Sequence, residues 1–274
     1  MGSGVKDRTT MPRCESPLVG DYLDAAGVQS ETRRVATDGS RRPSPRAAAY
    51  SLDETFRPVA FATCYVYSPR ARGVLAAGSR VLRARLKSAD PDWLARYTAR
   101  VRQLTTGFGR YEEFFGPDVV LVPVPRSRPL SPGTPWIAER LATGLVARGL
   151  AGSVWLGLQR RVAVRKSATS LAGERPTVAT HYRSLAGGQV LESQLGVHPA
   201  HKRAPERLLL VDDVVTKGRT LLAAAARLRE LCPASEVRAF ALVRTMGLVG
   251  YIDHLVMPCE GEIRWNGSDA SRQP

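Results

Sequence analysis

The sequence predicts an α/β fold, in which a mostly parallel sheet is flanked by helices. Strand-like and helix-like segments alternate from residue 56 onward, and DVVLVPVP at 118–125 is continuously apolar, as strands buried on both faces are. A third observation is RLLLVDD at 207–213, an apolar strand that leads into an alanine-rich helix. Because such alternation produces a wound parallel sheet, we expect ligands at the carboxyl ends of its strands.

The length and composition indicate one domain with appendages. The 274 residues are 43% hydrophobic, which is enough for one α/β core. Residues 1–55 are rich in Gly, Ser, Thr, Pro and charge, so we expect a disordered or poorly ordered tail there. The domain then covers 56–258, with an N-terminal helical or hood part at 56–115 and a core at 116–258, and 259–274 is assigned as a C-terminal tail.

Three elements are expected in the N-terminal part of the domain. VAFATCYVY at 59–67 has the β-branched and aromatic residues of a strand. A helix follows, since apolar residues recur at helical spacing at Val74, Leu75, Val81, Leu82 and Leu86. Pro91 begins a second helix after a capping Asp90, with one apolar face formed by Trp93, Leu94, Tyr97, Val101 and Leu104.

The core continues the alternation. The apolar strand at 118–125 is followed by a helix from about Pro135 to Arg148 and by a strand at SVWLGLQR, 153–160. Residues 162–203 are polar and contain glycine, which predicts a mobile loop with an irregular strand or two. The strand that begins at 207, a helix from Thr220 to Leu231 and a strand at EVRAFALVRT, 236–245, complete the sheet.

The chain is strongly basic, with 40 Lys and Arg against 25 Asp and Glu and a formal net charge of +15. Arginine predominates and suits phosphate recognition, which favours phosphate-bearing partners. The alternative is that scattered arginines only keep the surface charged, because the sequence has no clustered basic tail with interleaved aromatic residues.

The cysteines predict neither a zinc site nor a disulfide framework, because there is no C-x-x-C pair among Cys14, Cys64, Cys232 and Cys259. Such usage fits a reducing compartment. No apolar run approaches the roughly 18 residues of a membrane span, and no apolar segment follows the first charges of the chain. We therefore expect a cytoplasmic protein with no membrane partner, and oligomers stay possible.

The stretch from the strand at 207 into the following helix carries the clearest chemistry. Asp212 and Asp213 arrive at the carboxyl edge of the sheet, where each can accept hydrogen bonds from hydroxyls or help to hold a cation. Beyond them, a glycine-containing loop at a helix N-terminus favours a phosphate, and Thr216 and Thr220 add hydroxyl donors. A ribose 5-phosphate, with a vicinal diol near its phosphate, satisfies both halves. The alternative is an ordinary strand end capped by acids.

The thirteen residues LLLVDDVVTKGRT resemble the phosphoribosyl-pyrophosphate (PRPP) signature of type I phosphoribosyltransferases. The resemblance implies a type I phosphoribosyltransferase-like sheet, with Asp212 and Asp213 as catalytic residues that contact the ribose 2- and 3-hydroxyls. It also implies a loop around the 5-phosphate, formed by Thr216, Lys217, Gly218, Arg219 and Thr220. Lys217 departs from the family, which usually has a small residue there; its ammonium would strengthen phosphate binding or its bulk would crowd the loop.

A looser resemblance, over about residues 60–245, is to the ComF/GntX-like subgroup of that family, through the order of its segments. The cysteine-rich zinc module of the subgroup has no counterpart in this sequence, and SPGTPWIAE replaces its usual glycine-phenylalanine-asparagine-glutamine stretch. Both departures put the subgroup's role in DNA uptake in doubt.

A second loop follows the LVPVP strand at the same predicted sheet edge. Arg126, Ser127 and Arg128 stand there as candidate pyrophosphate ligands, since two guanidiniums can clamp a pyrophosphate bidentately. The alternative, which the sequence favours equally, is that Arg126 and Arg128 are solvated loop charges. Further cations border the polar segment that is expected to close over PRPP, although a solvated surface fits each of them singly: Arg161, Arg165, Lys166 and Arg175. The histidines show no nucleophile or metal pattern, so surface or loop positions are expected for His181, His198, His201 and His254.

These observations predict a protein that binds PRPP and transfers its phosphoribosyl group to an unidentified nitrogen acceptor with release of pyrophosphate, a pentosyltransferase reaction. Mg²⁺ would enter with PRPP and have no direct protein ligand. The alternative is a non-catalytic ComF-like accessory, or a sensor of PRPP or another ribose 5-phosphate-containing nucleotide, with single-stranded DNA as a candidate partner.

Overall fold

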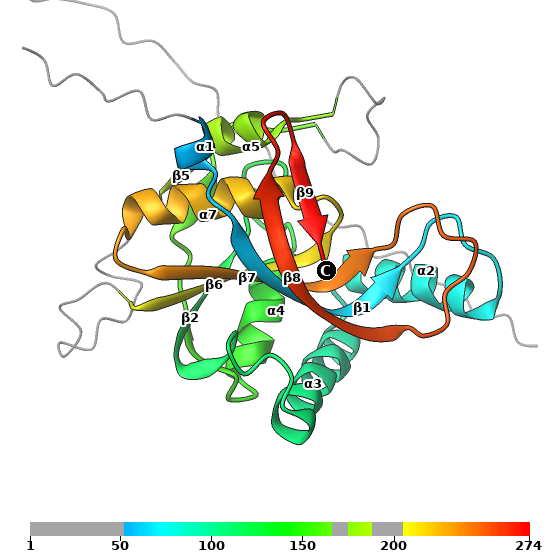
Figure 1. Ribbon diagram of the computed structural model, residues 1–274. Coiled ribbons are helices and arrows are strands. Elements are labelled where there is room, and N and C mark those ends of the chain that lie inside the picture. Colours follow the sequence, from blue (N-terminus) through cyan, green and yellow to red (C-terminus); the bar gives the residue numbers. More distant parts are fainter. Residues whose placement is uncertain (1–51, 166–174, 188–204) are drawn as a thin grey trace, which may run out of the picture. The chain divides into compact units, whose positions relative to one another are not determined.

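A seven-stranded sheet lies at the centre of the described part of the chain (Figure 1). The computed structural model describes residues 52–165, 175–187 and 205–274. The strands run in the order β3-β2-β6-β7-β1-β8-β9. The first five of these are mutually parallel: β3 (Ala151–Val154), β2 (Gly116–Pro123), β6 (Arg207–Val215), β7 (Glu236–Thr245) and β1 (Val59–Tyr67). The predicted α/β class with a mostly parallel sheet is confirmed.

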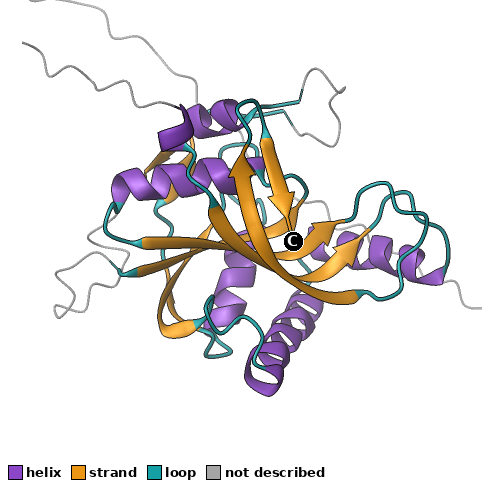
Figure 2. Ribbon diagram, in the orientation of Figure 1, coloured by secondary structure: helices purple, strands orange, loops and turns teal. Residues whose placement is uncertain are grey.

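Helices cover both faces of this sheet (Figure 2). One face carries α2 (Val74–Lys87), α3 (Pro91–Phe108) and α4 (Ile137–Val146), and the other carries α5 (Val178–Ser184) and α7 (Arg219–Leu231). Strand β6 shows the alternation that such burial requires, since Leu208 and Leu210 pack in the core beside α7 while Leu209 and Val211 pack in the opposite core.

The chain reverses its direction of winding between β2 and β6. From β2 it passes through α4 to β3, on one side, and from β6 it passes through α7 to β7, on the other. Strands β2 and β6 are themselves neighbours, with Pro123 paired to Val211 near their carboxyl ends. In open α/β sheets ligands bind at such a switch point, so the crevice beyond β2 and β6 is where a site is expected.

The helix predictions were confirmed in their positions but not in every buried face. Asp90 caps α3, because its Oδ1 accepts hydrogen bonds from the amides of Asp92 and Trp93 at 3.0 and 3.3 Å. In α2, however, Val74 is 88% exposed and Val81 55% exposed. The buried residues of α2 are Ala76, Ser79, Leu82 and Leu86, so only two of the five apolar residues that predicted this helix are buried.

The predicted strand at 153–160 is in fact divided between two sheets. Residues 153–154 end β3, and Leu158–Arg160 form β4, which pairs antiparallel with β5 (Leu185–Gly187). Residues 155–157 separate the two strands, and a Cβ atom at Gly157 would lie 2.0 Å from the Trp155 ring. Within the polar segment 162–203, α5 was also not predicted, and residues 166–174 and 188–204 lie outside the described residues.

The assignment of 259–274 as a C-terminal tail is wrong. Strand β8 (Val256–Trp265) pairs antiparallel with β1, and β9 (Ala270–Gln273) pairs antiparallel with β8. Most residues of β8 are only partly buried, as expected when an antiparallel strand faces solvent on one side, so the segment lacks a long apolar run. Of the tail predicted at 1–55, only 52–55 are described, and they form the short helix α1 (Leu52–Thr55).

In the described part of the chain, no helix combines the length and the apolar character needed to cross a membrane.

Candidate functional site

A cavity of about 220 Å³ opens at the carboxyl end of β6, beside the switch point. It brings together Asp212 and all five predicted residues of the phosphate loop. Its lining is formed by Arg175, His181, Asp212, Val214, Val215, Thr216, Lys217, Gly218, Arg219, Thr220 and Leu221. Most of the stretch singled out by sequence therefore lines this cavity, but Asp213 does not.

Gly218 sets the geometry of the loop between β6 and α7. It is the residue before α7 and has φ +87°, in the left-handed region that favours glycine. A Cβ atom there would lie 2.7 Å from both Cδ1 and Cγ2 of Ile263 in β8. No side chain caps the helix at this position. The first amides of α7, and the positive end of its dipole, therefore point to the loop as a place for an anion.

The two acids of β6 are held in different ways. Asp213 forms an ion pair with Lys87 at the end of α2, and its Oδ1 accepts from the Val214 amide at 2.9 Å. Asp212 lines the cavity and accepts from the Asp213 amide at 2.8 Å. Burial, and after it the adjacent Asp213 carboxyl, raise the pKa of Asp212 well above its ordinary value, which the Lys87 ammonium offsets in part. The pair thus places an acid whose pKa is raised beside a carboxylate that is paired with a cation.

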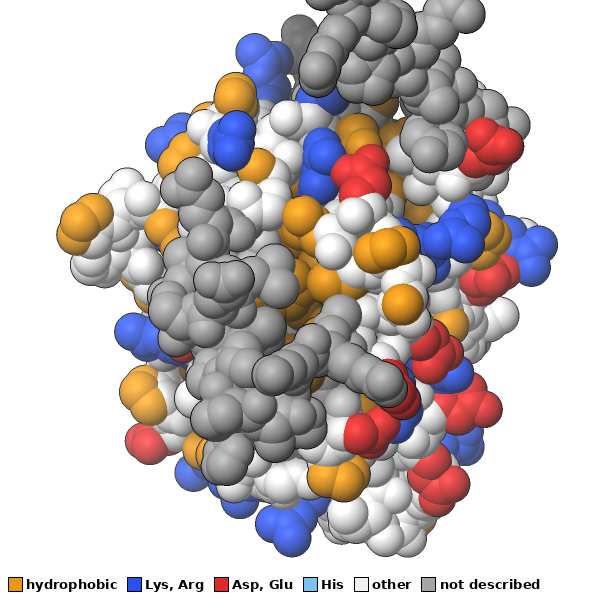
Figure 3. All heavy atoms as spheres, turned by 90° about the vertical axis from the view of Figure 1, so that its left-hand side faces the viewer, with side chains coloured by type: hydrophobic (Ala, Val, Ile, Leu, Met, Phe, Trp, Pro, Cys, Tyr) orange, Lys and Arg blue, Asp and Glu red, His pale blue; other side chains and the backbone are white. Residues whose placement is uncertain are grey.

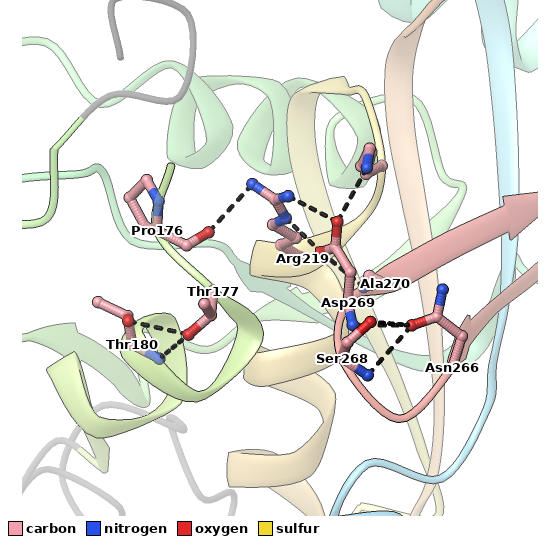
Figure 4. A network of polar contacts seen from close by, with 9 residues as sticks. Pro176, Thr177, Thr180, Arg219, Asn266, Ser268, Asp269 and Ala270 are labelled. Atoms are coloured by element: carbon pink, nitrogen blue, oxygen red, sulfur yellow. Dashed lines mark hydrogen bonds and ion pairs between the residues drawn. The ribbon is translucent and has the colours of Figure 1, made fainter. Parts of the chain in front are cut away.

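Asp269, in the turn between β8 and β9, binds both cations of the phosphate loop (Figure 4). Its Oδ2 lies 2.9 Å from Nζ of Lys217 and 2.6 Å from Nη2 of Arg219, and its Oδ1 accepts from Nε of Arg219. Burial alone would raise the pKa of Asp269, but hydrogen bonds from Arg219 and Lys217 outweigh it and hold the pKa below its usual range. The unusual Lys217 thus has an acidic partner outside the motif.

His181, expected at the surface or in a loop, is buried in α5 with 6% exposure and lines the cavity. Burial first, and then the charges of Arg160 and Arg219, lower the pKa of His181 to about 4. The ring is therefore neutral near pH 7, and its Nδ1 has no hydrogen-bond partner among the described residues. The buried residues of α5 are Val178, His181 and Ser184, and their spacing is that of one helix face.

Arg160 in β4 joins the small sheet to the loop after β2. It is 6% exposed, and it donates from Nε to the Arg126 carbonyl at 2.8 Å and from Nη2 to the Pro125 carbonyl at 3.4 Å. Nη1 donates to Oγ of Ser184. Burial lowers the pKa of Arg160 to about 10. Arg160 was not predicted as a site residue; it lies in a strand whose residues Leu158, Gln159 and Arg160 alternate between buried and exposed.

The proposed pyrophosphate loop lies at the same edge, since Arg126, Ser127 and Arg128 follow β2. The Ser127 carbonyl accepts from the Val164 amide at 2.7 Å. Arg126 and Ser127 are half-buried and Arg128 is exposed, and none of the three lines the 220 Å³ cavity. Their role as pyrophosphate ligands stays a prediction.

No family model and no curated protein sequence matches the chain. In the described ranges, no three His, Cys, Asp or Glu side chains gather into a set that could hold a metal ion.

Proposed function

We propose that this chain is a phosphoribosyltransferase-like protein of the type I class, which binds PRPP and transfers its phosphoribosyl group to a nitrogen acceptor with release of pyrophosphate. The main support for this proposal is the structure and position of residues 208–220. The stretch 208–220 is a buried strand, a loop and a helix start at the switch point of a parallel sheet, with an acid and the loop on one cavity wall.

The chemistry of the cavity suits the ribose 5-phosphate half of PRPP. The amides around Gly218 and the hydroxyls of Thr216 and Thr220 are donors for a phosphate, and Asp212 is an acceptor for a ribose hydroxyl. At about 220 Å³ the cavity is below the roughly 300–1,000 Å³ typical of whole ligand sites. The diphosphate would then extend past the cavity toward the loop after β2, where Arg126 and Arg128 lie.

In this reaction the protein positions the two reactants and stabilises the charge on the leaving group. The bond from the anomeric carbon to the diphosphate breaks with its electron pair on the diphosphate, the acceptor nitrogen forms the new bond to that carbon, and the acceptor loses a proton. Binding at both ends of the ribose would hold the carbon in line between nucleophile and leaving group. Nearby cations would stabilise the charge that develops on the diphosphate. No side-chain nucleophile is required.

Magnesium would enter with the diphosphate. Its ligands would be oxygens of PRPP and waters, with no direct ligand from the protein. When bound, the ion would neutralise charge on the leaving group.

The test is a calorimetric titration of PRPP, with magnesium, into the wild-type protein and into Asp212→Asn. Asp118→Asn is the matched control, because Asp118 is an exposed acid of β2 whose partner is Arg207, away from the cavity. We expect wild type and the control to bind alike and Asp212→Asn to lose at least tenfold in affinity, since one hydrogen bond to a charged group is worth about 1.5–3 kcal/mol. Absence of PRPP binding by folded wild type would refute the proposal.

A second titration addresses single-stranded DNA, a candidate partner that the ComF-like resemblance and the net charge of +15 favour. On the face shown in Figure 3, basic and acidic side chains are interspersed among the described atoms. Oligonucleotide affinity that falls steeply with salt would favour the accessory role, and release of pyrophosphate on addition of an amine or nucleobase would favour the transferase.

A further inference from the structure

The hairpin formed by β8 and β9 contacts the phosphate loop through three side chains. Ile263 packs at Gly218, close enough that any Cβ there would meet it at 2.7 Å. Asp269 binds the cations on either side of that glycine. Arg272 donates to the carbonyl of Val215 at 3.4 Å, just before the loop, and to the Thr245 carbonyl at 3.0 Å. The hairpin thus touches the loop before, at and after its glycine.

The turn of the hairpin is built to present Asp269 in one orientation. Oδ1 of Asn266 accepts hydrogen bonds from the amides of Ser268 and Asp269 at 3.2 and 2.8 Å, and the Asn266 amide donates to the Asp269 carbonyl at 3.0 Å (Figure 4). Such side-chain contacts to the backbone stabilise tight turns. The Asp269 side chain is 19% exposed, so its ion pairs are shielded more than those of a surface residue.

Arg219 extends the same contacts to a third segment. Its Nη1 donates to the Pro176 carbonyl at 3.1 Å, just before α5, while Nε and Nη2 bind Asp269. The Arg219 side chain, 15% exposed, therefore links the start of α7 to the hairpin and to the segment that leads to His181. A planar group bound at both edges has little freedom to rotate.

Asp269 does not line the cavity, whereas Lys217 and Arg219 do. The carboxylate therefore holds the two cations from outside the place where an anion would bind. If Asp269 instead competed with the phosphate for the two cations, its carboxylate would have to lie inside the cavity. The arrangement fits a support for the loop.

We propose that the β8–β9 hairpin is a brace for the phosphate loop and that Asp269 is its positioning residue. By fixing Lys217 and Arg219, Asp269 keeps the amides around Gly218 in the conformation that accepts a phosphate monoester. The identity of that ligand as a ribose 5-phosphate rests on the proposed function above, whereas the brace itself is a property of the free protein.

The experiment compares Asp269→Asn, Asp269→Glu and the control Glu262→Gln. Glu262 lies on the same hairpin and pairs with Arg264, so its substitution removes the same charge without touching the loop. The first readout is hydrogen exchange of amides 216–220 without ligand, with β7 amides as the reference for global stability. The second is calorimetric titration with ribose 5-phosphate.

We expect Asp269→Asn to speed exchange in the loop but not in β7, and to weaken ribose 5-phosphate binding about tenfold or more although it removes a negative charge near an anion site. Asp269→Glu should recover part of the affinity, and Glu262→Gln should behave as wild type. Unchanged loop exchange in Asp269→Asn, or tighter binding, would overturn the brace. If wild type does not bind ribose 5-phosphate, the proposed function fails, and the exchange comparison still decides the brace.

Discussion

The substitution Gly218→Ala tests whether the phosphate loop is shaped by the hairpin behind it. An alanine at this position faces two separate costs. Its backbone would have to keep φ near +87°, which disfavours L-residues by about 1–2 kcal/mol. Its Cβ would also meet Cδ1 and Cγ2 of Ile263 at 2.7 Å, and overpacking of this kind costs about 1–3 kcal/mol.

The two costs together predict a loss of roughly 2–5 kcal/mol in the free energy of unfolding. In a domain of this size, each kcal/mol corresponds to about 2–4 °C in melting temperature. Gly149→Ala is the matched control, because Gly149 has φ +71° and open space around its missing Cβ. It should lose only the backbone cost, about 1–2 kcal/mol.

A double-mutant cycle with Ile263→Ala separates the clash from the backbone. The single change at Ile263, a fully buried residue, is expected to cost about 2–5 kcal/mol. In the double mutant the clash is absent, so its cost should fall below the sum of the singles by about 1–3 kcal/mol. Urea unfolding of the four proteins measures this. Strict additivity, or a Gly218→Ala protein as stable as wild type, would refute the proposed contact between loop and hairpin.

Three titratable groups give further predictions. The folded-state pKa of Asp212 is raised above 3.8, so ionisation of Asp212 lowers the free energy of unfolding as pH rises past 3.8. The Asp212→Asn variant should therefore have a higher melting temperature than wild type at pH 7, and this advantage should be absent below pH 3.8. Asp118→Asn should melt lower at pH 7, because Arg207 lowers that pKa, and equal shifts in the two variants would contradict both assignments. Burial lowers the pKa of His181 from 6.5 to about 4, so roughly 3 kcal/mol of the free energy of unfolding should be lost as pH falls from 6.5 to 4. His181→Gln should abolish this pH-dependent loss, whereas a substitution of the exposed His254 should leave it unchanged. Lys87 lowers the pKa of Asp212, so Lys87→Met should move the pH midpoint of PRPP binding upward while Lys87→Arg keeps it; a fixed midpoint in both would exclude the coupling.

Structural features that depend only on residues close together in the sequence were predicted correctly. The cap at Asp90 and the bounds of the strand at 236–245 follow from side-chain chemistry and apolar pattern, and both were predicted. The loop between β6 and α7 is of the same kind, because its strand, glycine and helix start are contiguous in sequence. The small sheet of β4 and β5 could not be predicted this way, since its strands have three residues each and their pairing depends on α5 between them.

The hairpin of β8 and β9 escaped prediction for a related reason. A strand buried on both faces has a continuous apolar run, but β8 pairs with β1 on one edge and stays partly exposed along most of its length. Only Ile263 and Ala270 of the hairpin are fully buried. Asp269, which binds both cations of the loop, lies in a turn and has no periodic signal.

The motif fixes which charges meet at the site but not what balances them. Asp213 is paired with a lysine 126 residues away, and Lys217 and Arg219 share an aspartate 52 and 50 residues away. Partly buried charges are costly unless they are paired, so the sequence alone implies that partners exist. Their identity depends on which distant elements the fold brings to the sheet edge. A substitution confined to the motif therefore tests ligand contacts and these long-range pairs together, whereas changes at Lys87 or Asp269 test the pairs alone.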